Sequence, residues 1–391
     1  MNDMNIVIIG SGMYVCGRGT EGYGTVVPAL LQWAKNNTLG QVYVAARSAK
    51  GIKMAKAKIK RLSRDMGINT DFTYLCGKKS GKSAYVKALR EVPRPACAIV
   101  AVPDNLHTEI AGAAVRAGLH TLVVKPLAPT VKEAKALTAL QKKHGVYCAV
   151  EFHKRLDLAN HALRDAIRKR AIGSPLYFAV EYSQRKNIPY RHFKAWVENT
   201  NIFQYLGVHY ADIVYFSTGA TPLRAMAIGQ KGWLVSKGIN TYDSIEGVIE
   251  WKMPSGKKFV SHILTNWVDP ESSSAMSDQK IKVIGTEGRF ESDQKKRGIT
   301  IVTDKNGTEE PNPYFCSAYG EKGEVSYIGY GIDSINTFLS DAALIEEGKL
   351  NIKYLEKERP TFRQAIVSTA VVEAVNESLR RNSMWVAIRG I

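Results

Sequence analysis

The first 150 residues alternate short apolar runs with longer amphipathic stretches, and this alternation constrains the fold more than any other feature. Short apolar runs suit buried strands, whereas apolar positions that recur every three or four residues suit helices. Strands that alternate with helices build a parallel sheet covered on both faces. The expected strands are 5–9, 41–45, 98–102, 121–124 and 146–150, with helices over 110–117 and 131–143.

Beyond residue 151 the pattern changes. A helix expected over 158–170 is followed by strands rich in Thr, Val and aromatic residues, with turn residues between them. Such spacing is typical of a mostly antiparallel sheet. The expected strands are 175–182, 223–228, 245–253, 259–265, 280–284 and 299–302. The prediction is an α/β fold with a Rossmann dinucleotide-binding domain, 1–150, and an α/β domain with a large open sheet, 151–391, whose helix 361–379 can pack back on the first domain.

A glycine pair directly follows the first strand. Gly10 permits a tight turn, and Gly12 lets a pyrophosphate approach the backbone beside Met13. Val15 stands where the fingerprint has its third glycine, and a glycine-rich insert, 16–24, follows. The position straight after an apolar strand favours a dinucleotide site over an ordinary turn.

The end of the second strand distinguishes the two nicotinamide cofactors. An acidic residue there binds the ribose hydroxyl of NAD, whereas a cation binds the 2′-phosphate of NADP. The chain has Arg47 and Ser48 at this place and no carboxylate, so the sequence leans weakly to NADP over NAD.

Composition narrows the class of protein. The chain carries 54 Lys and Arg against 36 Asp and Glu, a formal charge of +18, with one basic run at 50–64. We interpret this run as a solvated helix face and expect no specific nucleic-acid partner. The five cysteines are widely spaced and form no Cys-x-x-Cys pair, which argues against a disulfide framework or a metal site and favours the cytoplasm. No run of about 18 apolar residues suggests a membrane span.

Two later strands are followed by residues that could bind a cofactor or transfer a proton. Pro103, Asn105 and His107 follow one strand, and Lys125 and Pro126 follow the next. The carboxyl ends of parallel strands line the ligand crevice, so all five are candidates for cofactor contact. A desolvated lysine there would have a lowered pKa and could exchange a proton with a substrate hydroxyl. His209, at the start of a helix in the second domain, is a second candidate for proton transfer.

With these segments in order, the chain resembles the Gfo/Idh/MocA oxidoreductase family, the glucose-fructose oxidoreductase and inositol dehydrogenase group. The resemblance rests on the glycine turn, the PDNLH and KPLA segments, the GVHYADI helix start and the IGTEGRFE turn. It implies a Rossmann domain followed by a domain whose open sheet presents substrate and often joins subunits, so we expect a homo-oligomer, a dimer or tetramer.

The resemblance also implies residue roles. The family's Glu-Lys-Pro segment supplies the catalytic lysine, which matches Lys125, although Val124 replaces the glutamate. The family's Asp-x-Gly-x-His segment maps to Tyr205, Gly207 and His209, so the histidine is kept and a tyrosine replaces the aspartate. Catalysis is thus expected from Lys125, His209 and Tyr205.

Polar and aromatic residues near these segments suit a sugar, whose ring has an apolar face and many hydroxyls. The candidate substrate residues are His153, Arg155, Tyr190, His192 and Asn201.

The sequence therefore predicts an NAD(P)-dependent oxidoreductase that transfers hydride between the nicotinamide and a secondary alcohol of a sugar, sugar acid, glycoside or polyol. One alternative is a redox-neutral enzyme that cleaves or eliminates a glycoside with tightly bound NAD(H) used transiently. A second is a nucleotide-binding regulator without enzymatic activity.

Overall fold

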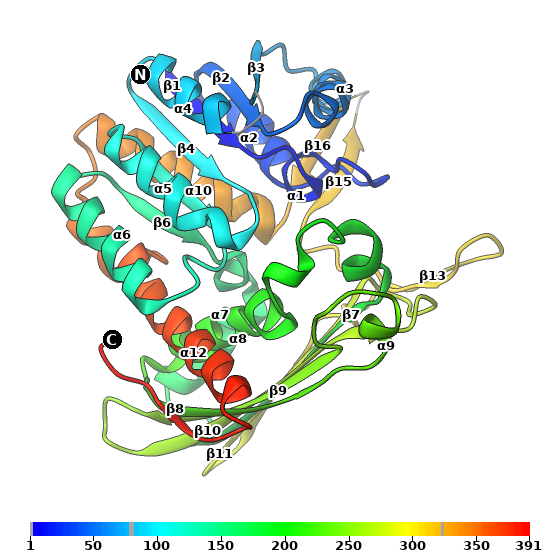
Figure 1. Ribbon diagram of the computed structural model, residues 1–391, viewed down its shortest axis with the longest axis vertical. Helices are drawn as coiled ribbons and strands as arrows, with labels where there is room; N and C mark the ends of the chain where they lie inside the picture. The colour runs from blue at the N-terminus through cyan, green and yellow to red at the C-terminus, as the bar shows by residue number, and fades with distance from the viewer. Residues whose placement is uncertain (1–2, 78–81, 322–323) are drawn as a thin grey trace. The chain divides into compact units, whose positions relative to one another are not determined.

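The computed structural model describes residues 3–77, 82–321 and 324–391 (Figure 1). The chain divides into two compact units. The first comprises residues 1–128, 132–153 and 314–365, and the second comprises residues 129–131, 154–313 and 366–391. The sequence placed the boundary near 150; in the structure a later segment, 314–365, also belongs with the first unit. Within the described residues, no helix is both long and apolar enough to cross a membrane.

The first unit is built on a six-stranded parallel sheet in the order β3-β2-β1-β4-β5-β6. Its strands are β1 (Met4–Ile9), β2 (Leu39–Ala46), β3 (Phe72–Cys76), β4 (Ala96–Val100), β5 (His120–Val124) and β6 (Cys148–Glu151). Its helices are α1 (Met13–Cys16), α2 (Val26–Ala34), α3 (Ala49–Asp65), α4 (Lys82–Glu91), η1 (Asp104–Leu106), α5 (His107–Arg116) and α6 (Val131–His144). The strands β1 and β4 are buried throughout, as expected for a sheet covered on both faces.

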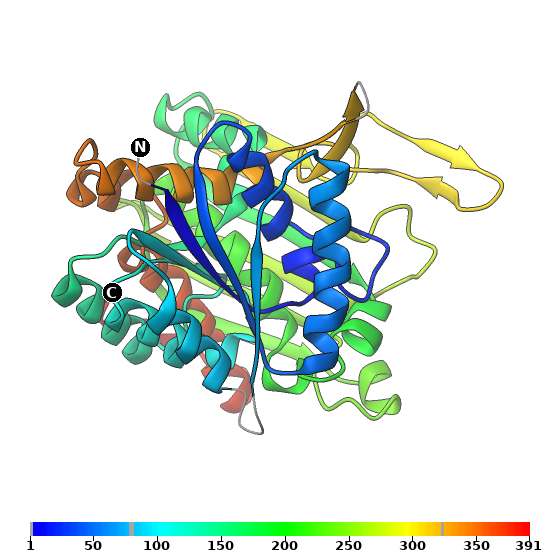
Figure 2. The ribbon, with the colours of Figure 1, turned by 90° about the horizontal axis from the view of Figure 1, so that it is seen from above.

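The returning segment completes the core of this unit. It contains the hairpin of β15 (Ser317–Glu321) and β16 (Glu324–Ile328), then α10 (Tyr330–Glu346) and α11 (Ile352–Glu358). The helix α10 lies alongside α2 (Figure 2), and their apolar side chains share one core with alternate residues of β1 and β2. The Trp33 indole donates to Ser340 Oγ at 3.0 Å. This segment therefore covers sheet surface that the first 150 residues leave open.

The second unit is built on a seven-stranded sheet in the order β12-β11-β7-β10-β9-β8-β17. Only β7 and β10 pair in parallel; the other pairs are antiparallel. Its strands are β7 (Pro175–Arg185), β8 (Thr221–Gln230), β9 (Ser244–Lys252), β10 (Lys258–Asp269), β11 (Ser277–Gly285), β12 (Arg289–Asp293) and β17 (Val386–Ala387), with a separate hairpin of β13 (Ile301–Thr303) and β14 (Gly307–Glu309).

Helices of this unit cover one face of that sheet (Figure 1). They are η2 (His153–Leu156, whose first residue belongs to the first unit), α7 (Leu158–Arg168), α8 (Val208–Thr218), α9 (Trp233–Ser236), α12 (Phe362–Arg380, whose first four residues belong to the first unit) and the short turns η3 (Ile188–His192), η4 (Val197–Asn199) and η5 (Phe203–Gly207). Residues of β10 alternate between buried and exposed, so its second face is open. The fold class expected from the sequence, a Rossmann domain with a second, mostly antiparallel domain, is confirmed.

Candidate active site

The glycine turn has the geometry that a pyrophosphate requires. Gly10 has φ +128°, and a Cβ atom there would lie 2.1 Å from the carbonyl oxygen of Ala101, so only glycine fits. A Cβ atom on Gly12 would meet nothing within 4 Å, which leaves open space beside the backbone. Met13 begins α1 directly after it. The turn therefore fits a phosphate group that approaches the chain closely.

The glycine-rich insert interrupts the helix that normally follows this turn. The helix α1 ends after one turn at Gly17, in the left-handed conformation, and α2 begins only at Val26. The Thr25 amide donates to the Tyr14 carbonyl at 2.7 Å, which brings the insert back to its starting point. Val15, at the third glycine's position, is fully buried. The insert is thus a compact loop between α1 and α2.

The end of β2 meets this insert. Ser48 caps α3 by accepting from the Gly51 amide at 3.1 Å, and Arg47 is exposed beside it. A Cβ atom added to Gly51 would lie 2.9 Å from Ser48 Oγ, 3.4 Å from Ser11 Oγ and 3.6 Å from Arg18 Nη1. Arg18 also donates from Nε to the Ser11 carbonyl at 2.5 Å. The insert therefore brings a second arginine, Arg18, close to Ser48. The sequence predicts that Arg47 and Ser48 bind the 2′-phosphate of NADP.

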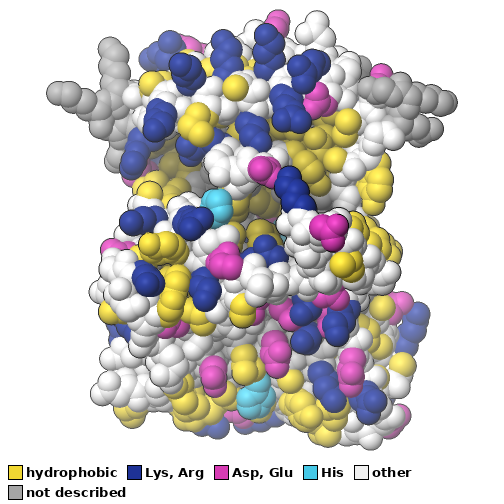
Figure 3. Space-filling model, turned by 90° about the vertical axis from the view of Figure 1, so that its right-hand side faces the viewer, with side chains coloured by type: hydrophobic (Ala, Val, Ile, Leu, Met, Phe, Trp, Pro, Cys, Tyr) yellow, Lys and Arg dark blue, Asp and Glu magenta, His cyan; other side chains and the backbone are white. Residues whose placement is uncertain are grey.

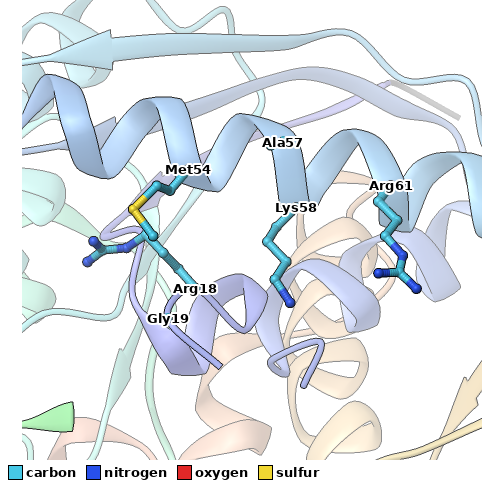
Figure 4. A pocket seen from close by; sticks show the side chains of 6 residues that line it. All are labelled: Arg18, Gly19, Met54, Ala57, Lys58 and Arg61. Atoms are coloured by element: carbon cyan, nitrogen blue, oxygen red, sulfur yellow. The ribbon is translucent and has the colours of Figure 1, made fainter. Parts of the chain in front are cut away.

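A hollow of about 360 Å³ lies between the insert and α3 (Figure 4). Lys58 extends from α3 and donates to the carbonyls of Thr20 and Gly22, which ties the insert to the helix. The other lining residues are Arg18, Gly19, Met54, Ala57 and Arg61. The basic run of α3 is otherwise exposed, and basic side chains are prominent on the upper part of the face in Figure 3. Arg18, Lys58 and Arg61 are the basic residues among those that line the hollow.

The loop after β4 is joined to the segment after β5 by His107. Its Nδ1 lies 2.6 Å from the Pro126 carbonyl and its Nε2 lies 2.9 Å from the Val102 carbonyl. Burial lowers the pKa of His107, while the Asp104 carboxylate opposes that shift. A neutral imidazole has a single N–H to donate, so one of these two carbonyls accepts a hydrogen bond from His107, and the ring lies against both segments. Pro103 and Asn105 flank Asp104 in the same loop, with Asn105 exposed.

Lys125 follows β5 at the carboxyl edge of the sheet, where it is largely buried. Burial lowers its pKa to about 7, and the carboxylates of Glu151 and Asp104 oppose the shift. A lysine with a pKa near 7 is present in both protonation states at neutral pH, so it can accept or donate a proton there.

Glu151 ends β6 and is 1% exposed. His153 Nδ1 lies 3.0 Å from each of its carboxylate oxygens. Burial and then the Glu151 charge raise the pKa of the Tyr14 hydroxyl well above its usual range. The first unit therefore gathers Lys125, Glu151, His153 and Tyr14 in one polar cluster, of which the sequence singled out only Lys125 and His153 as site residues.

In the second unit, Tyr205 lies in η5, a π-helical turn that leads directly into α8. Its ring is surrounded by the rings of Phe193, Trp196 and Trp267, at centroid distances of 5.0, 5.9 and 5.8 Å. His209 lies in the first turn of α8 and is buried near the Tyr182 ring. Sequence reasoning singled out both residues as catalytic candidates, but it did not anticipate that Tyr205 belongs to an aromatic cluster.

The expected substrate residues of this unit have different surroundings. Arg155 forms a buried, bidentate ion pair with Asp212, at 2.8 and 2.6 Å. Asn201 donates to Asn376 Oδ1 at 2.7 Å and accepts from the Gln204 amide at 2.9 Å. Both are therefore committed to interactions within the protein.

Tyr190 and His192 lie in the π-helical turn η3. The ring of Tyr190 packs edge-on against Trp233 at 5.8 Å, and His192 is exposed. These two side chains are the more accessible of the expected substrate residues. Within the part of the chain that the structure describes, no cluster of three His, Cys, Asp or Glu side chains could hold a metal ion.

Two family models match this chain, one in the Rossmann part and one in the second unit. A family model described as an oxidoreductase family with an NAD-binding Rossmann fold matches residues 4–152, and a Gfo/Idh/MocA C-terminal domain model matches residues 160–291. Among curated relatives, the 1,5-anhydro-D-fructose reductase of Ensifer adhaerens is 28% identical over 48% of this chain. That match spans only 54% of the reductase, about half its length. The myo-inositol 2-dehydrogenase of Thermotoga maritima is 23% identical over 71% of this chain and 83% of its own.

Solved structures show the same fold over the whole chain. Myo-inositol 2-dehydrogenase from Lactobacillus plantarum superposes with a TM-score of 0.70 at 16% identity, covering 99% of this chain and 100% of its own. Scyllo-inositol dehydrogenase from Lactobacillus casei, solved with NAD(H) and scyllo-inositol, gives a TM-score of 0.67 at 14% identity, with 99% of each chain covered.

Proposed function

The chain belongs to the Gfo/Idh/MocA oxidoreductase family, and from that premise we propose that it is an NAD(P)-dependent dehydrogenase or reductase of sugars or polyols. Its substrate is a secondary alcohol of a sugar, sugar acid, glycoside or polyol, or the matching ketone. The relatives named as inositol dehydrogenases and an anhydrofructose reductase support this class. The single observation that carries the proposal is the position of Lys125 at the carboxyl edge of a Rossmann sheet, where burial lowers its pKa to about 7.

The glycine turn is the proposed pyrophosphate site. The open space beside Gly12 and the close approach at Gly10 fit a dinucleotide, which supplies the hydride acceptor or donor when bound. Pro103, Asn105 and Pro126 line the neighbouring strand ends, and the His107 ring lies against the Pro126 carbonyl. These residues orient the cofactor.

Lys125 is the proposed proton-transfer group. In the oxidation direction its neutral amine accepts the hydroxyl proton as the carbon–oxygen double bond forms, and in the reduction direction its ammonium returns that proton. Partial burial favours the neutral amine, which an exposed lysine would hardly populate at pH 7. His209 and Tyr205 are the proposed proton-handling residues of the second unit.

NADP is the proposed cofactor in preference to NAD. Arg47 and Ser48 at the end of β2 are joined by Arg18, whose Nη1 reaches the start of α3. Two guanidinium groups and a hydroxyl suit the three oxygens of a 2′-phosphate. An acidic side chain, which would select the ribose hydroxyl, does not occur in the segment 44–50.

Substrate contacts are proposed for His153 of the first unit and for Tyr190 and His192 of the second, and supporting roles for Arg155 and Asn201. The aromatic cluster around Tyr205 offers ring faces of the kind that pack against the apolar face of a sugar. Arg155 and Asn201 would act by holding neighbouring residues, because their own groups already bind Asp212 and Asn376.

The open face of the second sheet supports assembly into a homo-oligomer. Tyr177, Ile228 and Leu264 are 40%, 45% and 37% exposed on strands of this sheet. Exposed apolar side chains on a sheet are typical of an interface between subunits. All five cysteines are free thiols, which supports a reducing compartment, the cytoplasm.

The deciding experiment compares wild type with Lys125→Met. Inositols, aldoses, sugar acids and glycosides are supplied with NAD or NADP, and NAD(P)H formation is followed by absorbance. Lys125→Met should lower kcat by about 10³-fold, within the range for loss of general acid–base catalysis, while the cofactor Kd changes little. Lys169→Met, which removes an exposed lysine paired with Asp165, is the matched control.

Full turnover by Lys125→Met would refute the assigned role. Product released from a glycoside without stoichiometric NAD(P)H would instead identify the redox-neutral enzyme.

A further inference from the structure

The register of β5 and β6 places Val124 opposite Glu151. Val124 stands where the family's Glu-Lys-Pro segment has its glutamate, directly before Lys125. We propose that Glu151 replaces that carboxylate from the neighbouring strand and acts as the positioning residue for Lys125. This inference rests on the proposed function of Lys125.

Strand geometry makes the substitution possible. Residues paired in register on neighbouring strands project to the same face and lie about 4.8 Å apart. Val124 and Glu151 are also the last residues of their strands, so both lie at the carboxyl edge. A carboxylate moved from 124 to 151 thus remains at the same edge and on the same face, one strand away.

Glu151 is held in a fixed orientation. It is 1% exposed, and His153 Nδ1 lies 3.0 Å from both of its oxygens. The His153 ring packs against the rings of Phe315, at 5.1 Å, and Tyr330, at 5.8 Å, both from the returning segment. A buried carboxylate with a fixed partner can orient a neighbouring ammonium, whereas a mobile exposed one could not.

Other charged and titratable groups act on Glu151 and Lys125. They come from α1, from the turn η1 and from α5. Glu151 and Asp104 act on Lys125, and Glu151 is the larger of the two influences. Tyr14, from α1, faces Glu151, and its hydroxyl stays protonated because burial raises its pKa. His107 faces Lys125 and Asp104 from α5. Glu151 is therefore the main anion that stabilises the charged form of Lys125, which burial destabilises.

The test replaces Glu151 by Gln and then restores a carboxylate at 124. In Glu151→Gln, the pKa of Lys125 should fall by about one unit, because the main opposing anion is lost. The rising limb of kcat in the oxidation direction should move to lower pH by the same amount. Its plateau should fall about tenfold, since a weaker base is a poorer catalyst. Val124→Glu combined with Glu151→Gln should recover most of both changes, and Asp104→Asn, the matched control, should have the smaller effect.

The pKa of Lys125 is measured without turnover, by NMR of protein reductively methylated with ¹³C and assigned with Lys125→Arg. An unchanged Lys125 pKa in folded Glu151→Gln protein overturns the inference, whatever happens to activity. A shifted pKa together with full turnover by Lys125→Met would leave the pairing intact and refute the proposed function instead. A lowered kcat with an unchanged pH limb would show that Glu151 only maintains the fold, and this too overturns the inference.

Discussion

Two lysines, one partly buried in the first unit and one fully buried in the second, are accommodated differently. Lys125 of the first unit faces two carboxylates at a sheet edge, and its pKa falls to about 7. Lys154 of the second unit is 2% exposed and donates to the side-chain oxygens of Gln279 and Gln294, the latter at 2.7 Å. The rings of Tyr182 and Tyr210 lie 5.1 and 5.4 Å from its ammonium.

The difference teaches how to separate a reactive lysine from a structural one. Amide oxygens and aromatic faces satisfy an ammonium in a closed setting and anchor it there. Lys125, in contrast, directly follows β5 at the carboxyl edge of a parallel sheet, where burial disfavours its charge. Burial alone does not identify function; the location in the fold and the chemistry of the partners do.

The largest expected effect separates the two lysines by stability. Lys154→Met should lower the free energy of unfolding by about 2–4 kcal/mol, because two buried amide oxygens lose their donor. Lys125→Met should not lower it at pH 7, because the folded state holds the Lys125 charge unfavourably. Urea unfolding of the cofactor-free proteins measures both. A comparable loss in the two variants would remove the distinction.

The pH dependence of turnover sharpens the description of Lys125. Oxidation requires the neutral amine, so its rate should rise by up to tenfold per pH unit below about 7 and level off above. Reduction requires the ammonium and should fall as pH rises through the same value. Rate profiles in both directions, at saturating cofactor, give the two limbs. Limbs centred near the ordinary lysine pKa would contradict a desolvated Lys125.

The smallest expected effect concerns the cations of the first unit that remain at its surface. Arg18→Ala and Arg47→Ala should each weaken NADP binding by about fivefold and change NAD binding by less than twofold, since only NADP carries the 2′-phosphate. Titration of NAD(P)H fluorescence gives both dissociation constants. Lys60→Ala, at an exposed position of α3, is the control. Equal losses for NAD and NADP would reject the assignment of the phosphate site.

Much of the first unit could be predicted because its signals are local. The apolar strands and the glycines of the first turn are adjacent in the chain, and β1, β4, β5 and β6 overlap the expected strands. The expected strand at 299–302 corresponds to β13, which belongs to a separate hairpin. The strand β3 and the hairpin of β15 and β16 were not predicted, because their half-buried residues give a weaker apolar pattern.

The polar cluster of Lys125, Glu151, His153 and Tyr14 could be predicted only in part from neighbouring residues in the sequence. Lys125 and His153 could be found from their places after strands, and the family resemblance named Lys125 as well. Glu151 is recognisable in the sequence as a charged residue at the last apolar strand of the first domain, but its pairing with Val124, 27 residues earlier, requires the register of the two strands. Arg18 lies in a glycine-rich insert. The spacing of residues in the sequence does not predict that this insert brings Arg18 close to Ser48.

The sequence by itself determined the alternation of strands and helices, the glycine turn and the family, because each depends on neighbouring residues or on ordered motifs. Only the tertiary structure decided that residues 314–365 complete the first unit and that Glu151 pairs in register with Val124, beside Lys125 in the chain. Strand register and core packing join residues far apart in the chain, and the desolvation that lowers the Lys125 pKa exists only once those segments have come together.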